Sequence, residues 1–152
     1  MFHVVLVEPQ IPQNTGNIAR LCAAAEMELL IVGRPGFSLS NRYLKRAGLD
    51  YWESVRLRLI LDAEAFLRGL DMSRSHLLTT KTERPYTGIT PRPGDYFLFG
   101  SETAGLPGWL LAAHPEACYT IPMKNPRVRS LNLATSVGIV MYHALSLHNF
   151  GR

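Results

Sequence analysis

Short runs of hydrophobic residues alternate with segments of mixed polarity along the whole chain. The run at 2–8 is rich in valine, and the run at 28–33 contains leucine, isoleucine and valine in succession. Apolar runs of this length are typical of strands that are buried on both faces of a sheet. Strands are therefore expected at residues 2–8, 28–33, 75–80, 95–100 and 118–123. A further strand is expected at 55–60, where polar and apolar residues alternate, as in a strand with one solvent-exposed face.

Longer segments with a helical spacing of apolar residues lie between these runs. Helices are expected at residues 18–27, 40–48, 62–70, 106–114 and 132–148. Strands that alternate with helices predict an α/β fold with a mostly parallel sheet and helices on both of its faces. Residues 81–95 form the one long irregular segment of this scheme, and such a loop in a compact domain is usually functional or mobile.

Length and composition favour one globular domain, because the chain has 152 residues, of which 47% are hydrophobic and 18% charged. The net charge of +4 permits a polyanionic partner without requiring one. Cys22 and Cys118 are expected to be buried thiols, and the five histidines show no metal-ligand spacing, so no metal is expected. There is no signal peptide pattern and no unbroken apolar stretch of about 18 residues, which predicts a cytoplasmic protein outside the membrane.

The residues that could bind a ligand lie mostly where the expected strands end. In open α/β sheets, ligands bind beyond the carboxyl ends of the strands. Here those ends run into polar, turn-forming segments that begin near residues 8, 79, 100 and 121. The sequence lacks a P-loop, a G-x-G-x-x-G turn after the first strand and a G-x-S-x-G elbow, which disfavours common nucleotide-binding folds and triad hydrolases.

Three of the motifs at these ends also have purely structural interpretations. Asn14 or Thr15 would cap the helix that follows, Glu102 would accept hydrogen bonds from nearby free N–H groups, and Asn132 would start the last helix. Arg20 argues for a ligand instead. If it lies in the first turn of its helix, it faces the positive end of the helix dipole, and an anion to be bound would explain it better.

Taken together, the motifs resemble a known family. The segments "NTGNIAR" (14–20), "FLFGSETAGLP" (97–107) and "IPMKNPRVRSLNLATSVGIVMYHAL" (121–145) resemble the three signature segments of SPOUT-class RNA methyltransferases, in particular their ribose 2′-O-methylating branch. The segment "RAGLDYW" (46–52) further resembles the subfamily that methylates the wobble nucleotide of tRNA. Two positions depart from the pattern: His143 stands where glutamate is expected, and Ala104 where a basic residue is common.

The resemblance implies a single SPOUT domain with a deep C-terminal trefoil knot and no separate RNA-binding extension. It also implies S-adenosylmethionine as cofactor, S-adenosylhomocysteine as product, tRNA as partner, no metal and a homodimer formed through the last helix. The implied cofactor contacts are Leu78, Gly100, Ile121, Met123, Ser130, Leu131 and Asn132. The implied reactive side of the pocket comprises Arg20, Asn14, Asn17 and Glu102. The cations expected to bind RNA are Arg20, Arg42, Lys45, Arg46, Lys124, Arg127 and Arg129.

The last helix is apolar on more than one side, so it must be buried on more than one side. Leu133, Val137, Val140 and Ala144 are assigned to the core of the chain. A partner subunit would contact Ala134, Gly138, Met141 and Leu145. The alternative is a central core helix in a monomer.

Methyl transfer requires a weakly acidic ribose hydroxyl to attack the methyl group, so its proton must be removed or its developing charge stabilised. Arg20 is the usual candidate for the base in such enzymes, but arginine does not give up its proton in proteins. We therefore expect Arg20 to hold the adjacent phosphate and the developing alkoxide, which leaves the proton acceptor open. Two other interpretations remain: a non-catalytic RNA-binding module, and an unrelated small-molecule enzyme without a knot.

Overall fold

The structure, a computed structural model, describes residues 1–39 and 52–151. Six strands form one sheet in the order β3-β2-β1-β5-β4-β6, and every neighbouring pair is parallel. The strands are β1 His3–Val7, β2 Glu28–Val32, β3 Arg56–Ile60, β4 Ser75–Leu78, β5 Tyr96–Phe99 and β6 Cys118–Tyr119. The predicted α/β class with a parallel sheet is confirmed.

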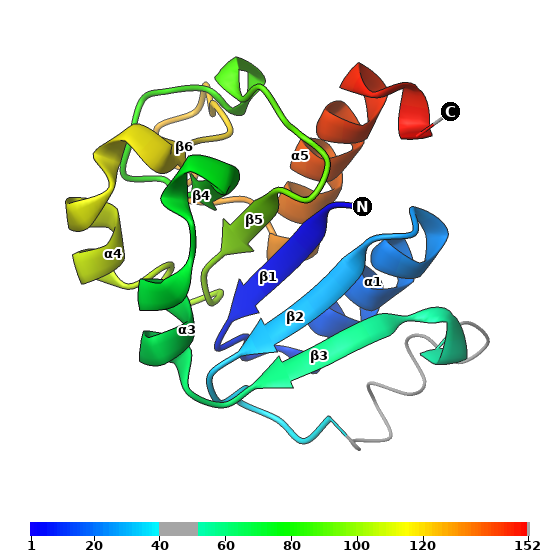
Figure 1. Cartoon of the computed structure of the whole chain (residues 1–152). Coiled ribbons are helices and arrows are strands. Elements are labelled where there is room, and N and C mark those ends of the chain that lie inside the picture. The colour runs from blue at the N-terminus through cyan, green and yellow to red at the C-terminus, as the bar shows by residue number, and fades with distance from the viewer. Residues whose placement is uncertain (40–51, 152) are drawn as a thin grey trace.

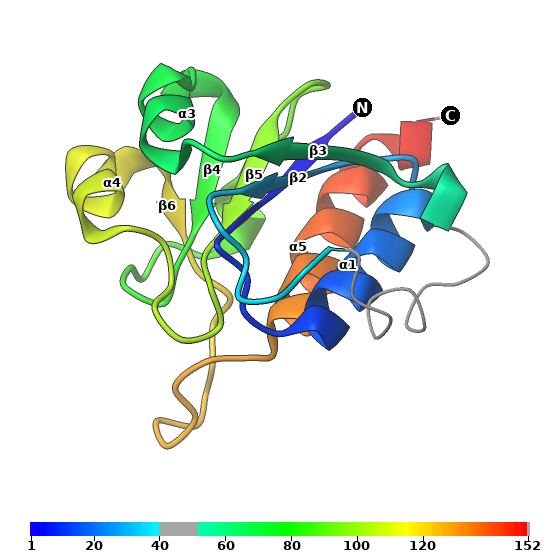
Figure 2. The same cartoon turned by 90° about the horizontal axis from the view of Figure 1, so that it is seen from below.

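Helices cover both faces of the sheet, with α1 and α5 on one face and α3 and α4 on the other (Figures 1 and 2). Their bounds are α1 Pro12–Ala24, α3 Ala63–Gly69, α4 Gly108–Ala113 and α5 Leu133–Leu147. Short 3₁₀ helices occur at Trp52–Ser54, Met72–Arg74, Tyr86–Gly88, Pro115–Ala117 and Asn149–Gly151. The helix expected at 40–48 lies outside the described residues.

Side chains of β1 alternate between two hydrophobic clusters, one on each face of the sheet. Val4 and Leu6 pack in the cluster that contains the buried residues of α1 and α5. Val5 and Val7 pack in the cluster that contains Leu110 of α4 and other residues of that face. Because both faces of the central strand are buried, its sequence shows an unbroken apolar run rather than an alternation.

Two expected elements have different bounds. α1 begins at Pro12, six residues before the expected start, with proline in its first turn and no side-chain cap from Ile11. Asn14 and Thr15 lie inside the helix, so neither caps it. The strand expected at 118–123 ends at Tyr119, and only an isolated bridge to Pro85 continues the pairing at the next residue.

The core-facing side of α5 is wider than expected, because Ala134 and Leu145 are partly buried and pack against the core cluster too. Leu133, Val137, Val140 and Ala144 are buried as predicted. Met141 is fully buried as well, so its assignment to a partner subunit is wrong. Its position four residues after Val137 places it on the same side of the helix, where it extends the buried stripe.

The long irregular segment at 81–95 is held at several points. The N–H of Tyr86 donates to the carbonyl of Thr120 over 2.8 Å, and the N–H of Thr120 donates to the carbonyl of Arg84 over 2.7 Å. At its end, the buried Asp95 lies 2.8 Å from Nε2 of His76. Burial raises the pKa of Asp95, but hydrogen bonds from His76, from Arg74 and from a backbone N–H outweigh it, so the pKa is lowered.

Candidate functional site

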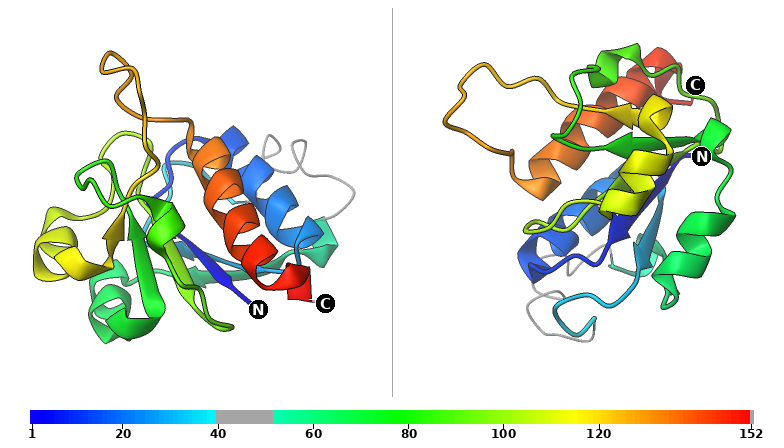
Figure 3. Two further views of the ribbon diagram at one scale, coloured as in Figure 1. Left: turned by 90° about the horizontal axis from the view of Figure 1, so that it is seen from above. Right: turned by 90° about the vertical axis from the view of Figure 1, so that its left-hand side faces the viewer.

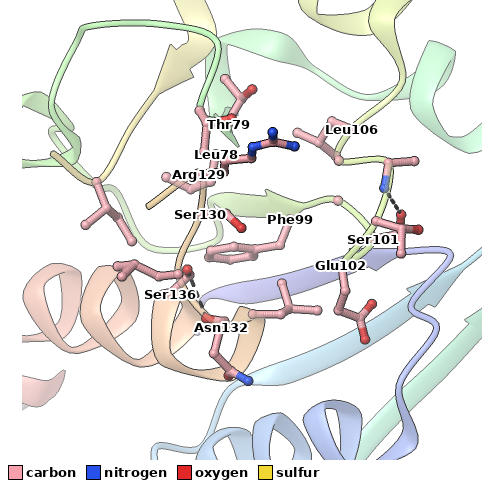
Figure 4. Close-up of a pocket in the computed structure, with 18 of the residues that line it drawn as sticks. Leu78, Thr79, Phe99, Ser101, Glu102, Leu106, Arg129, Ser130, Asn132 and Ser136 are labelled. Atoms are coloured by element: carbon pink, nitrogen blue, oxygen red, sulfur yellow. Dashed lines mark hydrogen bonds between the residues drawn. The ribbon is translucent and has the colours of Figure 1, made fainter. Parts of the chain in front are cut away.

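One cavity of about 690 Å³ lies at the carboxyl ends of β4, β5 and β6 (Figure 4). Turns that follow these three strands form much of its wall, and the starts of α1 and α5 complete it. This is the edge of the sheet at which a parallel α/β fold presents its ligand-binding loops.

The cavity gathers most of the residues that the sequence singled out. All seven implied cofactor contacts line it, namely Leu78, Gly100, Ile121, Met123, Ser130, Leu131 and Asn132. Asn14 and Glu102 from the implied reactive side line it too. These residues come from segments up to 118 positions apart in the chain, and the fold places them around one space.

The turn after β5 has a conformation that requires glycine. A Cβ atom at Gly100 would lie 2.0 Å from the carbonyl carbon of Gly105 and 2.1 Å from the backbone nitrogen of Leu106. Gly105 itself has a φ of +69°, which favours glycine, and its N–H donates to the carbonyl of Ser101 over 3.0 Å. The Ser101 hydroxyl accepts from the N–H of Ala104 over 3.0 Å. The turn is therefore tightly closed, and it forms a backbone wall of the cavity.

Glu102 in this turn binds the beginning of α1. Its Oε1 accepts from the N–H of Gln10 over 2.9 Å, and its Oε2 accepts from the N–H of Ile11 over 2.7 Å. The side-chain amide of Asn14 also donates to Oε2, over 3.2 Å. The prediction that Glu102 can serve nearby free N–H groups is confirmed.

A further hydrogen bond connects α1 to α5. The Asn132 amide donates to Oδ1 of Asn14 over 3.0 Å, and Oδ1 of Asn132 accepts from the N–H of Thr135 over 3.2 Å. Asn132 is thus the N-cap of α5, as predicted. Its carbonyl also accepts from the Ser136 hydroxyl over 3.1 Å (Figure 4). The chain Glu102–Asn14–Asn132 therefore joins all three motif segments beside the cavity.

Arg20 lies apart from this cluster. It is exposed on α1 and does not line the cavity. Because α1 begins at Pro12, Arg20 is more than two turns into the helix, so the dipole argument for an anion at this position is wrong. Its assignment to phosphate or alkoxide binding stays a prediction that rests on the family resemblance.

Apart from Arg20, the expected RNA-binding cations fall into two groups. Lys124, Arg127 and Arg129 are exposed on the segment between β6 and α5, which projects from the body of the molecule (Figure 3). Arg129 also lines the cavity, as do Leu78 and Thr79 (Figure 4). The remaining three, Arg42, Lys45 and Arg46, lie outside the described residues.

Several lining residues were not singled out from the sequence. They include hydroxyl side chains, one cation and apolar residues, namely Thr79, Thr80, Lys81, Phe99, Ser101, Thr103, Leu106, Leu111, Thr120 and Ser136. Thr79, Thr80 and Lys81 directly follow β4, so the rule that ligands lie beyond the strand ends was sufficient to find them. Leu111 on α4 carried no such signal, since it reads as an ordinary helix residue.

The two cysteines lack the character of reactive thiols. Burial raises the pKa of Cys22 to about 12. The pKa of Cys118 is also raised, first by burial and then by the nearby charge of Glu116. Among residues 1–39 and 52–151, no group of three or more His, Cys, Asp or Glu side chains is arranged to hold a metal ion. None of the helices in that part of the chain is long and apolar enough to cross a membrane.

Comparisons of the sequence with known proteins identify the family. The family model of the SpoU rRNA Methylase family matches residues 1–142. A tRNA (cytidine(34)-2'-O)-methyltransferase from Escherichia coli (strain K12) is 43% identical over 145 residues, which make up 95% of this chain and 92% of that protein.

Solved structures of RNA methyltransferases also resemble this chain in their fold. One presented as "Structural insights into the 2-OH methylation of C/U34 on tRNA" superposes with a TM-score of 0.90 at 45% identity, covering 100% of this chain and 98% of that one. An AdoMet-bound rRNA methyltransferase from Sinorhizobium meliloti gives a TM-score of 0.82 at 25% identity, covering 96% of this chain and 56% of that one. The fold of these proteins is the knotted SPOUT fold, so the predicted knot is confirmed. The chain belongs to the SpoU rRNA methylase family.

Proposed function

We propose that this protein transfers a methyl group from S-adenosylmethionine to the ribose 2′-OH of the wobble nucleotide of tRNA, a cytidine or a modified uridine at position 34. The observation that carries the proposal is the cavity at the strand ends, which all three motif segments line. Full-length similarity to a tRNA (cytidine(34)-2'-O)-methyltransferase supports the choice of substrate. A tRNA substrate also favours the cytoplasm as the place of action.

The cavity fits S-adenosylmethionine in its chemistry. Apolar side chains such as Leu78, Phe99 and Leu106 offer surfaces for an adenine ring, and the closed turn at Gly100 offers backbone groups that can read its polar edge. Threonine and serine hydroxyls on the same wall can bind the ribose and the amino-acid end. When bound, the cofactor supplies an electrophilic methyl group on a positively charged sulfur.

The protein then has to hold RNA at the mouth of this cavity. Lys124, Arg127 and Arg129 are exposed on one projecting segment, and Arg129 reaches the cavity wall. Charged hydrogen bonds from arginine to phosphate are strong and directional, so this segment is suited to bind the backbone beside the target ribose. Arg20 would stabilise the alkoxide that develops on the ribose oxygen.

A homodimer formed through α5 is part of the proposal. Within the chain, a Cβ atom added at Gly138 would meet no atom within 4 Å, and Tyr142 on the next turn is 42% exposed. A helix side that combines a glycine with exposed aromatic surface can accept a second helix at close range. Light scattering at micromolar concentration tests this, and a species of 17.0 kDa alone would contradict it.

Labelled methyl transfer to defined tRNA transcripts tests the function. We expect transfer to a transcript with a normal ribose at position 34 and none when that ribose lacks its 2′-OH. Methylation that persists on the deoxy transcript would place the target elsewhere in the RNA. A protein that binds S-adenosylhomocysteine but methylates no RNA would support the non-catalytic interpretation instead.

The role of Arg20 is tested by Arg20→Lys. Lysine keeps the charge but loses the planar fork that binds phosphate through two hydrogen bonds. If Arg20 binds phosphate and alkoxide, the variant should stay slow at every pH. If it removes the proton, lysine should regain activity toward pH 10, because free lysine loses its proton near about 10.4.

A further inference from the structure

Glu102 was expected to act in the chemistry, yet its carboxylate is already engaged. Both of its oxygens accept hydrogen bonds from Gln10, Ile11 and Asn14, at 2.7 to 3.2 Å. Two of these donors are backbone N–H groups at the entry to α1. The turn that carries Glu102 is itself closed by the close approach of Gly100 to Gly105. A proton transferred to one oxygen of Glu102 would compete with the hydrogen bonds that this oxygen accepts and weaken them.

The entry to α1 needs this external acceptor. The first N–H groups of a helix lack partners within the helix, and a polar side chain at the N-cap usually binds them. Here the N-cap is Ile11, which has no such side chain, and the first turn contains no acidic residue. Glu102 supplies a negative charge from 91 positions further along the chain, at the end where the helix dipole favours it. The backbone N–H groups that it binds are those of the N-cap Ile11 and of Gln10 before it.

We propose that Glu102 is a positioning residue that caps α1 from the turn after β5 and, through Asn14, fixes the start of α5 at Asn132. It sets where α1, and with it Arg20, lies relative to the cavity, and it exchanges no proton with the substrate. The inference rests on the proposed methyl transfer for its catalytic consequence and on the hydrogen bonds alone for the capping role.

The variant Glu102→Gln tests both parts, because glutamine keeps the size of the side chain but has only one acceptor oxygen and directs an N–H₂ group at other donors. If Glu102 positions α1, methyl transfer should fall on the order of 100-fold, as expected for a misplacement of about 1 Å. The loss should be equal at every pH, and affinity for S-adenosylhomocysteine should be nearly unchanged. A variant whose pH–rate profile loses a titrating limb would identify Glu102 as the acid or base and overturn the proposal.

Asn14→Ala and the double variant give a second criterion. If both residues act through one hydrogen-bonded chain, the double variant should be no slower than the slower single variant. Losses that multiply would contradict a shared role. Glu64→Gln is the matched control, since Glu64 is an exposed carboxylate on α3, on the other face of the sheet, and should leave the rate unchanged.

Hydrogen exchange separates the capping role from the proposed function. The amides of Gln10 and Ile11 should exchange faster in Glu102→Gln than in the wild type, and no faster in Glu64→Gln. Unchanged protection of both amides would overturn the capping role even if methyl transfer is observed. Faster exchange in a protein that methylates no RNA would uphold the cap and refute the proposed function alone.

Discussion

Gly100→Ala tests whether the tight turn after β5 sets the shape of the cavity. The added Cβ would lie 2.0 Å from the carbonyl carbon of Gly105 and 2.1 Å from the nitrogen of Leu106. Non-bonded carbon atoms prefer a separation of about 3.5 Å, so the backbone at Gly100 and the backbone at Gly105 must move apart by roughly 1.5 Å. Both atoms that are struck belong to the backbone, so a change of rotamer cannot relieve the overlap.

We expect this substitution to lower the free energy of unfolding by about 1–3 kcal/mol, the usual cost of overpacking. It should also displace Ser101 and Leu106, which line the cavity, and so weaken the binding of S-adenosylhomocysteine. Urea denaturation measures the first effect, and titration calorimetry measures the second.

Gly108→Ala is the matched control. Gly108 begins α4, its φ is not positive, and a Cβ there would meet no atom within 4 Å. Alanine at such a site should leave stability unchanged or raise it by about 0.4–1 kcal/mol, because the unfolded chain loses freedom. If Gly100→Ala is as stable as Gly108→Ala and binds the ligand equally well, the turn does not shape the site.

Three further predictions concern other parts of the molecule. A Cβ atom at Gly138 would meet no atom of the same chain within 4 Å, so Gly138→Leu should act mainly by weakening the proposed dimer; light scattering that shows an unchanged dimer would exclude Gly138 from the interface. Asp95→Asn should lower stability by about 1–3 kcal/mol at pH 7. Since the pKa of Asp95 is lowered in the folded protein, this stabilisation is complete above the unfolded pKa of about 3.9 and is lost as pH falls through the folded value, so urea denaturation should show the gap between wild type and variant closing in acid. Affinity for tRNA should fall with salt by a log–log slope of about −0.7 to −0.9 per phosphate contact, and Arg129→Ala should remove about one contact from that slope.

Local sequence patterns were enough to predict the fold class. Apolar runs such as 2–8 and 28–33 mark buried strands whatever their neighbours are, and β1 and β2 lie within these ranges. The start of α1 was missed because Pro12 lies in a segment interpreted as a turn, although proline is also common in the first turn of a helix. Ile11 gives no cap, and the carboxylate that replaces one comes from Glu102, which only the folded structure brings into contact.

The positions of residues in the turns beside the cavity could be predicted from the sequence. The positions of residues on helices were harder to predict, because they depend on how each helix is oriented and where it begins. Gly100 and Asn132 stand directly at the ends of their elements, so their place beside the cavity follows from the topology. Met141 was assigned to the wrong side because α5 is apolar almost all round, and periodicity cannot orient such a helix. Arg20 shows the same limit, since a shift of six residues in the start of α1 changed its relation to the helix dipole.

A basic, exposed segment directly precedes the apolar helix α5, and the structure gives a physical reason for this order. Its cations need solvent and an anionic partner, whereas α5 needs burial, and the change between these environments takes place at Asn132. Asn132 closes the first turn of α5 and binds Asn14 of α1, which in turn binds Glu102. The segment that is proposed to bind RNA is thereby anchored at one end to the layer of α1 and α5. An anchored segment loses less conformational freedom when RNA binds, so more of the energy of its phosphate contacts remains for holding the ribose at the cavity.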